Sequence, residues 1–597
     1  MILQALYEYY LDLLANDEIE PDGWSTEKIS YGVLLDDAGK LKDLLDLRET
    51  GEKKDKNIPR VVSVPERQNR TSGVRPFYLC DNSKYILGIG DEKSSGRLED
   101  YFQACKDLHQ DYLKDIGSPM ARSIFEFFNT WKPDQAKDDP IIQEKWDDLI
   151  KGANLIFCCE EQGNILLATE DEKIRDAWQK VVDSAGQNTQ GQLCLVSGKI
   201  APVSLSHPKI KGVAGAQSSG ASLVSFNQES FCSYGSTKDS QGANAPISKQ
   251  VAFGYTKALN TLLSDKDSFC RLGETTVVYW AKGGNKAYQE IASIMLGGEE
   301  ALTGDDSQKT LDLPAIMKKL STGRQLDWND EMLDTDTEFY ILGLAPNGGR
   351  ISVDFFWQNK FGKLLENVKE HYDRLEIVRA KQDTRVYLSP RMLVAQTVRT
   401  TTPGTTPAKP SKRLPRDLMF SILNNTPYPA TLLNGVVIRM RAEQGVRRGQ
   451  AAILKAYYLK NSRNETFKEV LTVELNKDTT YMPYVLGRLF AVLERLQKDA
   501  QGDINTTIRD RYFNSASATP ARVFPILINL AQRHMDKLGT AAQISYSKRI
   551  AELEGRITES LPTRLKLEEQ GAFQLGYYHQ VQDFYTKKET KEEDNNG

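Results

Sequence analysis

A stretch of Thr, Pro and Gly at residues 400–413 most constrains how this chain can fold. It reads TTTPGTTPAKPSKR, and its only apolar side chain outside the prolines is one Ala. Such a stretch has little to bury in a core, and its prolines favour extended backbone. We therefore predict an exposed linker with a differently built part of the chain on each side.

The part before the linker carries strand signals. TEFYILGL and RISVDFFW flank the turn sequence PNGG at residues 346–349, and apolar Ile351, Val353 and Phe355 alternate with polar residues. This alternation beside a Pro/Asn/Gly turn is typical of a β-hairpin. We therefore expect a large mixed body that contains β-hairpins.

The part after the linker carries helix signals. Leu486, Leu489, Phe490, Leu493 and Leu496 recur at the spacing of one helix face. The predicted fold class is α+β, with an all-helical C-terminal bundle after the mixed body. The predicted boundaries are 1–398 for the mixed N-terminal body, 399–413 for the linker, 414–480 for a basic helical connector and 481–597 for the bundle.

The composition excludes several classes of protein. The 77 Lys and Arg nearly balance the 81 Asp and Glu, so the chain is not uniformly basic. The Cys form no CxxC pair, the five His are scattered and no P-loop motif occurs. No apolar run approaches the roughly 20 residues that span a bilayer, and the N-terminus lacks signal-peptide features. We expect a soluble, cytoplasmic protein with no membrane contact, metal, cofactor or catalytic residues, although an active site assembled from distant residues stays open.

A basic loop is the first candidate site. In RQNRTSGVR, residues 67–75, three arginines alternate with amides and hydroxyls, which can neutralise phosphates and read base edges. Gly73 would let the backbone approach DNA closely. The candidate motif-reading residues are Arg67, Gln68, Asn69, Arg70, Ser72 and Arg75. The alternative is an ordinary solvated surface loop.

Two further segments are candidates for contact with a nucleic-acid backbone. IKGVAGAQSSGASLVSFN, residues 210–227, is rich in Gly and Ser, and small residues allow close approach of another backbone or tight packing within one domain. Residues 431–463 hold seven cations against Glu443 alone, an excess that either binds a polyanion or lies on a solvated face. The candidate backbone contacts are Lys209, Lys211, Arg439, Arg441, Arg447, Arg448 and Lys455.

Several segments resemble one known family. They are MILQALYEYY at the N-terminus, the Gly/Ser-rich block with the following NAPISKQVAFGYTKALNTLL and TTVVYWA, the hairpin FYILGLAPNGGRISVDFFW, and GAFQLGYYHQ at residues 571–580. The chain is similar from end to end to the large subunit of the type I-C CRISPR Cascade complex, the Csd-type Cas-eight family. The linker at 400–413 and the residues of the basic loop depart from that pattern.

The resemblance implies a subunit of a bacterial surveillance complex. Its partners would be guide RNA, target DNA, the Cascade backbone and handle-binding subunits, and a helicase–nuclease. The large subunit is expected to recognise the protospacer-adjacent motif in duplex DNA, to aid strand opening and R-loop stabilisation, and to help recruit the helicase–nuclease without cutting. A guide-RNA-processing subunit and a purely structural subunit of the same complex are the alternatives.

The resemblance also implies a small subunit related to residues 482–597. Such systems are thought to make it from an internal start in the large-subunit gene. Met482 precedes PYVLGRLFAVLERL, in which Pro483 suits the first turn of a helix. The alternative is that Met482 is an ordinary internal methionine.

Overall fold

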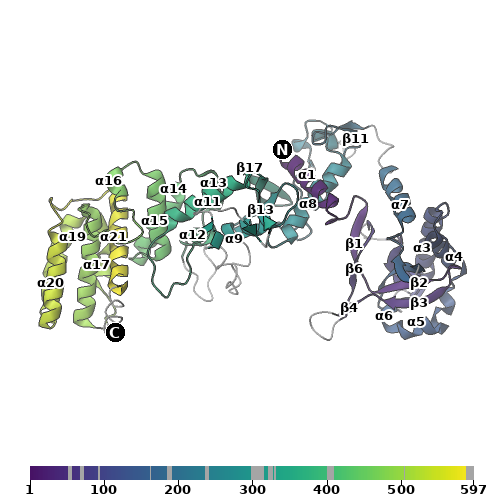
Figure 1. Cartoon of the computed structure of the whole chain (residues 1–597), viewed down its shortest axis with the longest axis horizontal. Coiled ribbons are helices and arrows are strands. Elements are labelled where there is room, and N and C mark those ends of the chain that lie inside the picture. The colour runs from purple at the N-terminus through teal and green to yellow at the C-terminus, as the bar shows by residue number, and fades with distance from the viewer. Residues whose placement is uncertain are drawn as a thin grey trace. The chain divides into compact units, whose positions relative to one another are not determined.

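The chain forms two compact units (Figure 1). The first unit holds residues 3–207 and 226–255, and the second holds 208–225 and 256–597. The computed structural model describes the chain except for residues 51–56, 68–72, 92–94, 162, 185–190, 227, 235–240, 298–314, 317, 320–326, 329–330, 400–408, 503 and 587–597. Most of the predicted linker therefore lies outside the described residues, and the predicted boundaries around it stay predictions.

A five-stranded sheet organises the first unit. Its strand order is β3 (Leu41–Asp46), β2 (Tyr31–Leu35), β8 (Asn154–Glu161) and β7 (Cys80–Asn82), with β9 (Asn164–Leu167) also paired to β8. The β2–β8 pair is parallel and the others are antiparallel. A separate antiparallel ribbon joins β1 (Trp24–Ile29) to β6 (Arg60–Pro65). The main helices of this unit are α1 (Ile2–Ala15), α2 (Ser83–Ile86), α3 (Leu98–Leu113), α4 (Pro119–Thr130) and α7 (Glu172–Ser184).

A four-stranded antiparallel sheet organises the beginning of the second unit. Its order is β12 (Phe269–Leu272), β13 (Thr275–Ala281), β16 (Glu338–Asn347) and β17 (Arg350–Lys360). The β16–β17 hairpin turns at Gly348, whose φ of +61° favours glycine. One face of the sheet, with Tyr279, Phe339 and Trp357, packs in a core with α9 (Ala287–Leu296) and α11 (Phe361–Leu375).

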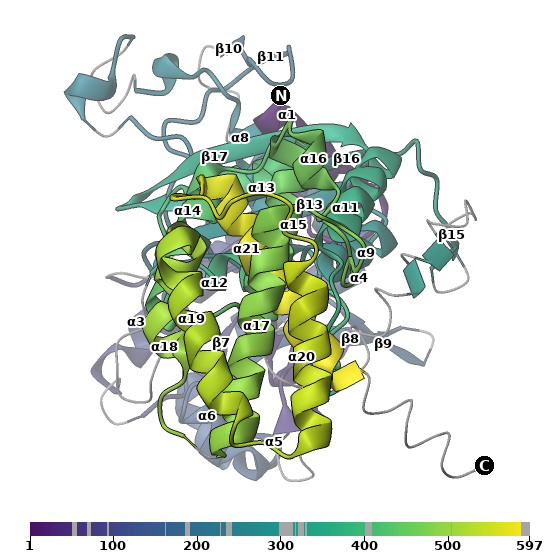
Figure 2. The same cartoon turned by 90° about the vertical axis from the view of Figure 1, so that its left-hand side faces the viewer.

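Helices dominate the rest of the second unit, which confirms the expected α+β class with an all-helical C-terminal part. They are α12 (Pro390–Ala395), α13 (Leu414–Asn424), α14 (Ala430–Glu443), α15 (Arg448–Asn461), α16 (Glu465–Lys468), α17 (Met482–Gln501), α18 (Ile508–Ala518), α19 (Pro520–Met535), α20 (Thr540–Glu554) and α21 (Leu567–Thr586). Figure 2 shows α17 between α19 and α20. Met482 is the first residue of α17.

Helix α21 lies between two cores. Residues 571–580 are all buried. Ala572, Leu575 and Tyr578 pack in the core that includes α15, whereas Phe573 and Tyr577 pack in the core of the terminal bundle. The terminal bundle is therefore joined to the preceding helices by a shared helix with apolar contacts on both sides.

Candidate nucleic-acid interface

The described part of the basic loop begins with an inward-facing arginine. The Arg67 guanidinium donates to the Cys80 carbonyl at 3.2 Å, lies 3.5 Å from a Glu27 carboxylate oxygen and stacks over the Phe77 ring. Its side chain is 13% exposed. These contacts anchor the loop on β7 and β1, so Arg67 has little surface left with which to read a base.

Gly73 and Arg75 of this loop lie at the surface, whereas Val74 packs against the core of the first unit. Gly73 has a φ of +83°, no atom lies within 4 Å of the position that a Cβ would take, and Arg75 is exposed. The backbone N–H of Arg75 donates to the Tyr85 hydroxyl at 3.3 Å. The predicted contacts Gln68, Asn69, Arg70 and Ser72 lie outside the described residues, so their role as motif readers stays a prediction.

The Gly/Ser-rich segment forms a small, well-anchored hairpin. Ile210 and Ala221 exchange two backbone hydrogen bonds of 2.9 Å. The Asn260 side chain accepts from the Lys211 N–H at 2.8 Å and donates to the Lys209 carbonyl at 3.1 Å. Gly220, at φ +95°, packs so closely on Lys209 and Ile210 that a larger residue would collide with them. Small residues therefore serve local packing at the base of this loop.

The tip of the same loop, residues 217–219, is polar and exposed. Two successive turns present Gln217, Ser218 and Ser219 to solvent. The Ala216 N–H donates to the Val213 carbonyl in the first turn, and the Gly220 N–H donates to the Gln217 carbonyl in the second. The signal that could have found them is a QSS run between two turn glycines. We call this group, together with exposed Lys209 and Lys211, the QSS loop.

The QSS loop lies beside the tip of the β16–β17 hairpin. The Ser222 N–H donates to the Gly349 carbonyl at 3.2 Å, and Ile351 donates back to Ser222 at 3.0 Å. Asn347 is exposed at the hairpin tip. The side-chain ammonium of Lys209 donates to the Ser222 hydroxyl at 2.9 Å, which holds one cation at the base of the loop. Cations, hydroxyls and amides thus share one surface and can contact phosphates and base edges.

The arginine cluster after α13 is partly neutralised by the fold. Glu443 forms ion pairs with Arg439 and Arg447, and these guanidiniums hold the pKa of the Glu443 carboxyl below its usual range despite burial. Arg448 lies 2.9 Å from Asp383 and donates to the carbonyls of Arg385 and Val386. The local excess of charge in the sequence is therefore smaller in the folded chain.

Lys455 is a buried lysine. It is 3% exposed, and its ammonium donates to the Arg374 carbonyl at 3.0 Å, near the C-terminal end of α11. Burial lowers its pKa to about 8. A lysine in this position satisfies helix-end carbonyls, so we leave Lys455 out of the candidate nucleic-acid surface. Arg441 is exposed and donates to the Gln570 side chain at 3.1 Å.

All five histidines are buried. Three of them bond a tyrosine hydroxyl: His207 with Tyr255 at 2.6 Å, His371 with Tyr428 at 2.6 Å and His579 with Tyr484 at 2.8 Å. The seven cysteines are unpaired thiols. Within the described ranges, no three His, Cys, Asp or Glu side chains gather as metal ligands would.

The structure thus defines a two-unit α+β protein whose candidate sites are polar surfaces on loops and helices. None of the described helices is both long and apolar enough to cross a bilayer.

The chain belongs to the family of CRISPR-associated proteins described as Cas_Csd1. The family model matches residues 6–585, which is nearly the whole chain, and this confirms the resemblance seen in the sequence. No curated protein matches the chain.

Proposed function

We propose that this chain is the large subunit of a type I-C CRISPR surveillance complex and recognises the protospacer-adjacent motif in duplex DNA. The observation that carries the proposal is the family match over residues 6–585. In this role the chain also aids strand opening, stabilises the R-loop and helps to recruit the helicase–nuclease. Its partners are guide RNA, target DNA and the backbone and handle-binding subunits.

The physical demands of this role suit exposed polar loops. Guide pairing reads the target sequence, and replacing a DNA duplex with an RNA–DNA hybrid is nearly neutral in free energy. A few contacts to the motif can therefore decide whether opening starts. The QSS loop offers an amide, two hydroxyls and two cations on one surface, and exposed Arg75 offers a guanidinium on the basic loop. We propose that both loops contact the duplex.

The proposal predicts that binding by the assembled complex depends on the flanking trinucleotide. Gln217→Ala and Arg75→Ala should each weaken binding of the motif-bearing duplex by about 1–3 kcal/mol where the side chain reads a base. Lys211→Ala should instead weaken all duplexes similarly and lower the log K against log salt slope by about one. The measurement is equilibrium binding to duplexes that differ only at the trinucleotide.

Lys363→Ala is the matched control for this experiment. Lys363 is an exposed cation on α11 whose ammonium pairs with Glu366 at 2.9 Å, so its loss should leave binding unchanged. A complex that binds all trinucleotides equally would contradict motif recognition and favour a structural subunit.

We also propose that the chain is not itself an enzyme. The buried state of all five histidines supports this, because it leaves no histidine poised at the surface for acid–base chemistry. Cleavage of guide-RNA precursor by the isolated chain would contradict the proposal and favour the RNA-processing alternative.

A small subunit related to residues 482–597 is a further proposed partner. Met482 begins α17, and Pro483 occupies the first turn of that helix. The intact mass of complexes purified from the single gene should therefore include a species that begins at or near residue 482. A preparation with abundant full-length protein and no such species would contradict the internal start.

A further inference from the structure

The outer face of α13 combines two arginines with an exposed aromatic ring. Leu414, Leu418, Met419, Ile422 and Leu423 pack into the core. On the opposite side lie four exposed residues at helical spacing. We call these four, Arg413, Arg416, Phe420 and Asn424, the α13 face.

The cations of the α13 face have no ion-pair partner. Within the part of the chain that the structure describes, no carboxylate lies within 4 Å of the guanidinium of Arg413 or Arg416. Asp417, the one acidic residue of α13, is half-buried beside the face. Two positive charges are therefore held at the surface without compensation, which favours an anionic ligand.

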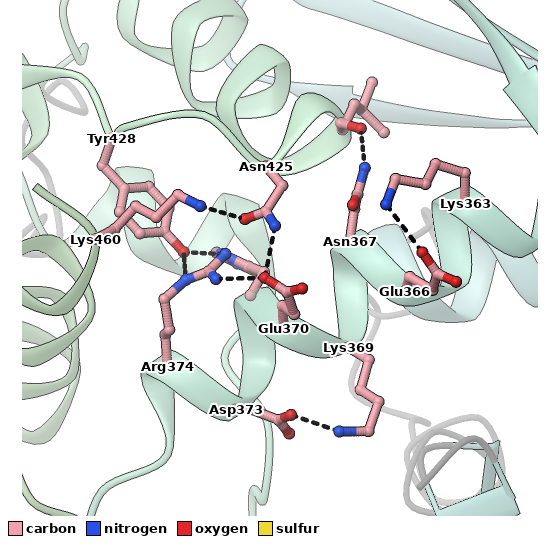
Figure 3. A network of polar contacts seen from close by, with 12 residues as sticks. Lys363, Glu366, Asn367, Lys369, Glu370, Asp373, Arg374, Asn425, Tyr428 and Lys460 are labelled. Carbon is pink, nitrogen blue, oxygen red and sulfur yellow. Dashed lines mark hydrogen bonds and ion pairs between the residues drawn. The ribbon is translucent and has the colours of Figure 1, made fainter. Parts of the chain in front are cut away.

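Helix α11 shows how charged side chains are neutralised within one helix of this unit (Figure 3). Its charged side chains pair with one another along the helix. Lys363 binds Glu366 at 2.9 Å, Lys369 binds Asp373 at 2.6 Å, and Arg374 binds Glu370 at 3.0 Å. Among the residues that the structure describes, Arg413 and Arg416 of the α13 face lack the neutralising partners that the charges of α11 have.

Phe420 adds an aromatic ring to this cationic face. The residue is 50% exposed. A lone exposed apolar side chain is common on protein surfaces, but Phe420 lies one helical turn from Arg416, about 6 Å along the axis. Cations beside an exposed ring are what proteins use to hold single-stranded nucleic acid, because the bases stack on the ring while the cations follow the phosphates.

We propose that the α13 face binds single-stranded DNA, with Phe420 stacking on a base and Arg413 and Arg416 contacting phosphates. A duplex does not suit the ring, since its bases are already stacked on one another. A preference for RNA would call for a polar side chain that contacts the 2′-hydroxyl, and the Asn424 amide of this face already donates to the Phe420 carbonyl at 3.0 Å. The inference rests on the proposed function in one respect, because opening of the target duplex supplies the strand.

The test is binding of the full-length chain to a fluorescein-labelled 20-nucleotide DNA strand of mixed sequence. Phe420→Ala should raise Kd by about tenfold or more, in line with the value of one stacked base. Phe420→Trp should retain the affinity, because a larger ring also stacks. Arg416→Ala should lower the magnitude of the log K against log salt slope by about 0.7. Phe420 and Arg416 are exposed, so these changes should leave the urea midpoint unchanged.

Ile438→Ala is the matched control, since Ile438 is an apolar residue on α14 that is 65% exposed. It should leave DNA binding unchanged. Equal Kd values for Phe420→Ala and the unmodified chain would overturn the inference, as would equal binding of RNA of the same sequence or equal competition by poly-glutamate. Unchanged binding by Phe420→Ala would mean that the ring does not stack on a base. Equal binding of RNA would mean that the face does not prefer DNA, and equal competition by poly-glutamate would indicate an acidic protein partner.

Motif-dependent duplex binding is measured on the same variants to separate this inference from the proposed function. In one outcome, complexes bind all flanking trinucleotides equally, but Phe420→Ala still weakens binding of single-stranded DNA. This result would refute the proposed function and support single-strand binding by the α13 face. Complexes that read the motif while Phe420→Ala binds the single strand normally would do the reverse.

Discussion

Gly487→Ala is expected to force α17 and α21 apart and to lower the free energy of unfolding by about 3 kcal/mol or more. At Gly487 an added Cβ would overlap the carbonyl oxygen of Phe573 and lie 2.8 Å from its carbonyl carbon and 2.9 Å from the Tyr577 nitrogen. The obstacle is backbone of the facing helix, so no rotamer change relieves it. The two helices would have to move apart along their buried length.

The same argument applies to the partner helix. A Cβ at Gly576 would overlap the Tyr484 carbonyl oxygen and lie 3.0 Å from its carbonyl carbon. Gly576→Ala should therefore destabilise the chain by a similar amount. Because the two glycines share one contact, the double variant should cost less than the sum of the two single variants.

Urea unfolding of the full-length chain, followed by circular dichroism, measures this effect. Gly539→Ala is the matched control, because Gly539 has a φ of −68° and open space where the Cβ would lie. Gly539 is the N-cap of α20, where Ala is less favourable than Gly, so the midpoint should fall slightly and far less than that of Gly487→Ala. Equal midpoints for Gly487→Ala and Gly539→Ala would show that the helices do not pack at backbone contact.

Helix α17 was predictable from the sequence, whereas the close packing of α21 against it was not. A helix with one apolar face was predictable from the spacing of Leu486, Leu489 and Leu493, since that signal is local. The surroundings of α21 were not, because residues 571–580 are buried on every side and carry no amphipathic pattern. A centrally placed helix is defined by partners that are distant in the sequence.

Among the β-strands, too, the local hairpin was predictable and the long-range pairing was not. The β16–β17 hairpin was predictable because PNGG and the flanking alternation are neighbours in the chain. The parallel pairing of β2 with β8 joins Tyr31 to Leu155 across more than a hundred residues of intervening chain. No local pattern marks such a pair, because long connections carry no information on register.

The candidate sites were predictable as exposed loops and less so as individual contacts. Lys209 and Lys211 are at the surface, as a phosphate contact requires. Arg67 and Lys455 instead serve the fold, because Glu27, Cys80 and the end of α11 provide partners that no reading of the adjacent sequence reveals. Composition shows that a segment is basic, but only tertiary contacts show which of its charged groups are already paired or hydrogen-bonded within the fold.

Acid is expected to unfold the protein between about pH 6.5 and pH 4, because its histidines are buried in neutral form. Burial lowers the pKa of His109 and His207 to about 4 and that of His371 and His579 to about 3. These values lie below the 6.5 of an exposed histidine, so between the two pKa values the unfolded chain binds more protons than the folded chain. Stability is therefore complete above pH 6.5 and is lost as the pH falls.

The size of this effect follows from the number of groups. One histidine whose pKa falls from 6.5 to about 4 removes on the order of 3 kcal/mol once the pH is below both values. A folded protein has only about 5–15 kcal/mol in total, so four such groups can exhaust its stability. Carboxyl groups with lowered pKa values, such as Glu370 and Glu443, add to this loss once the pH falls to the ordinary pKa of 4.5 that they have in the unfolded chain.

Urea midpoints measured from pH 7.5 to pH 4.5 test the prediction. His371→Asn removes one titrating group while keeping a polar atom near the Tyr428 hydroxyl, which His371 contacts at 2.6 Å. Its stability should be lower at pH 7.5, but its loss of stability per pH unit should be smaller than that of the unmodified chain by up to about 1.4 kcal/mol, the value of one proton. Identical pH dependence in the two proteins would mean that His371 has the same pKa in the folded and the unfolded chain, and a flat profile in both would mean that the buried histidines do not limit stability in acid.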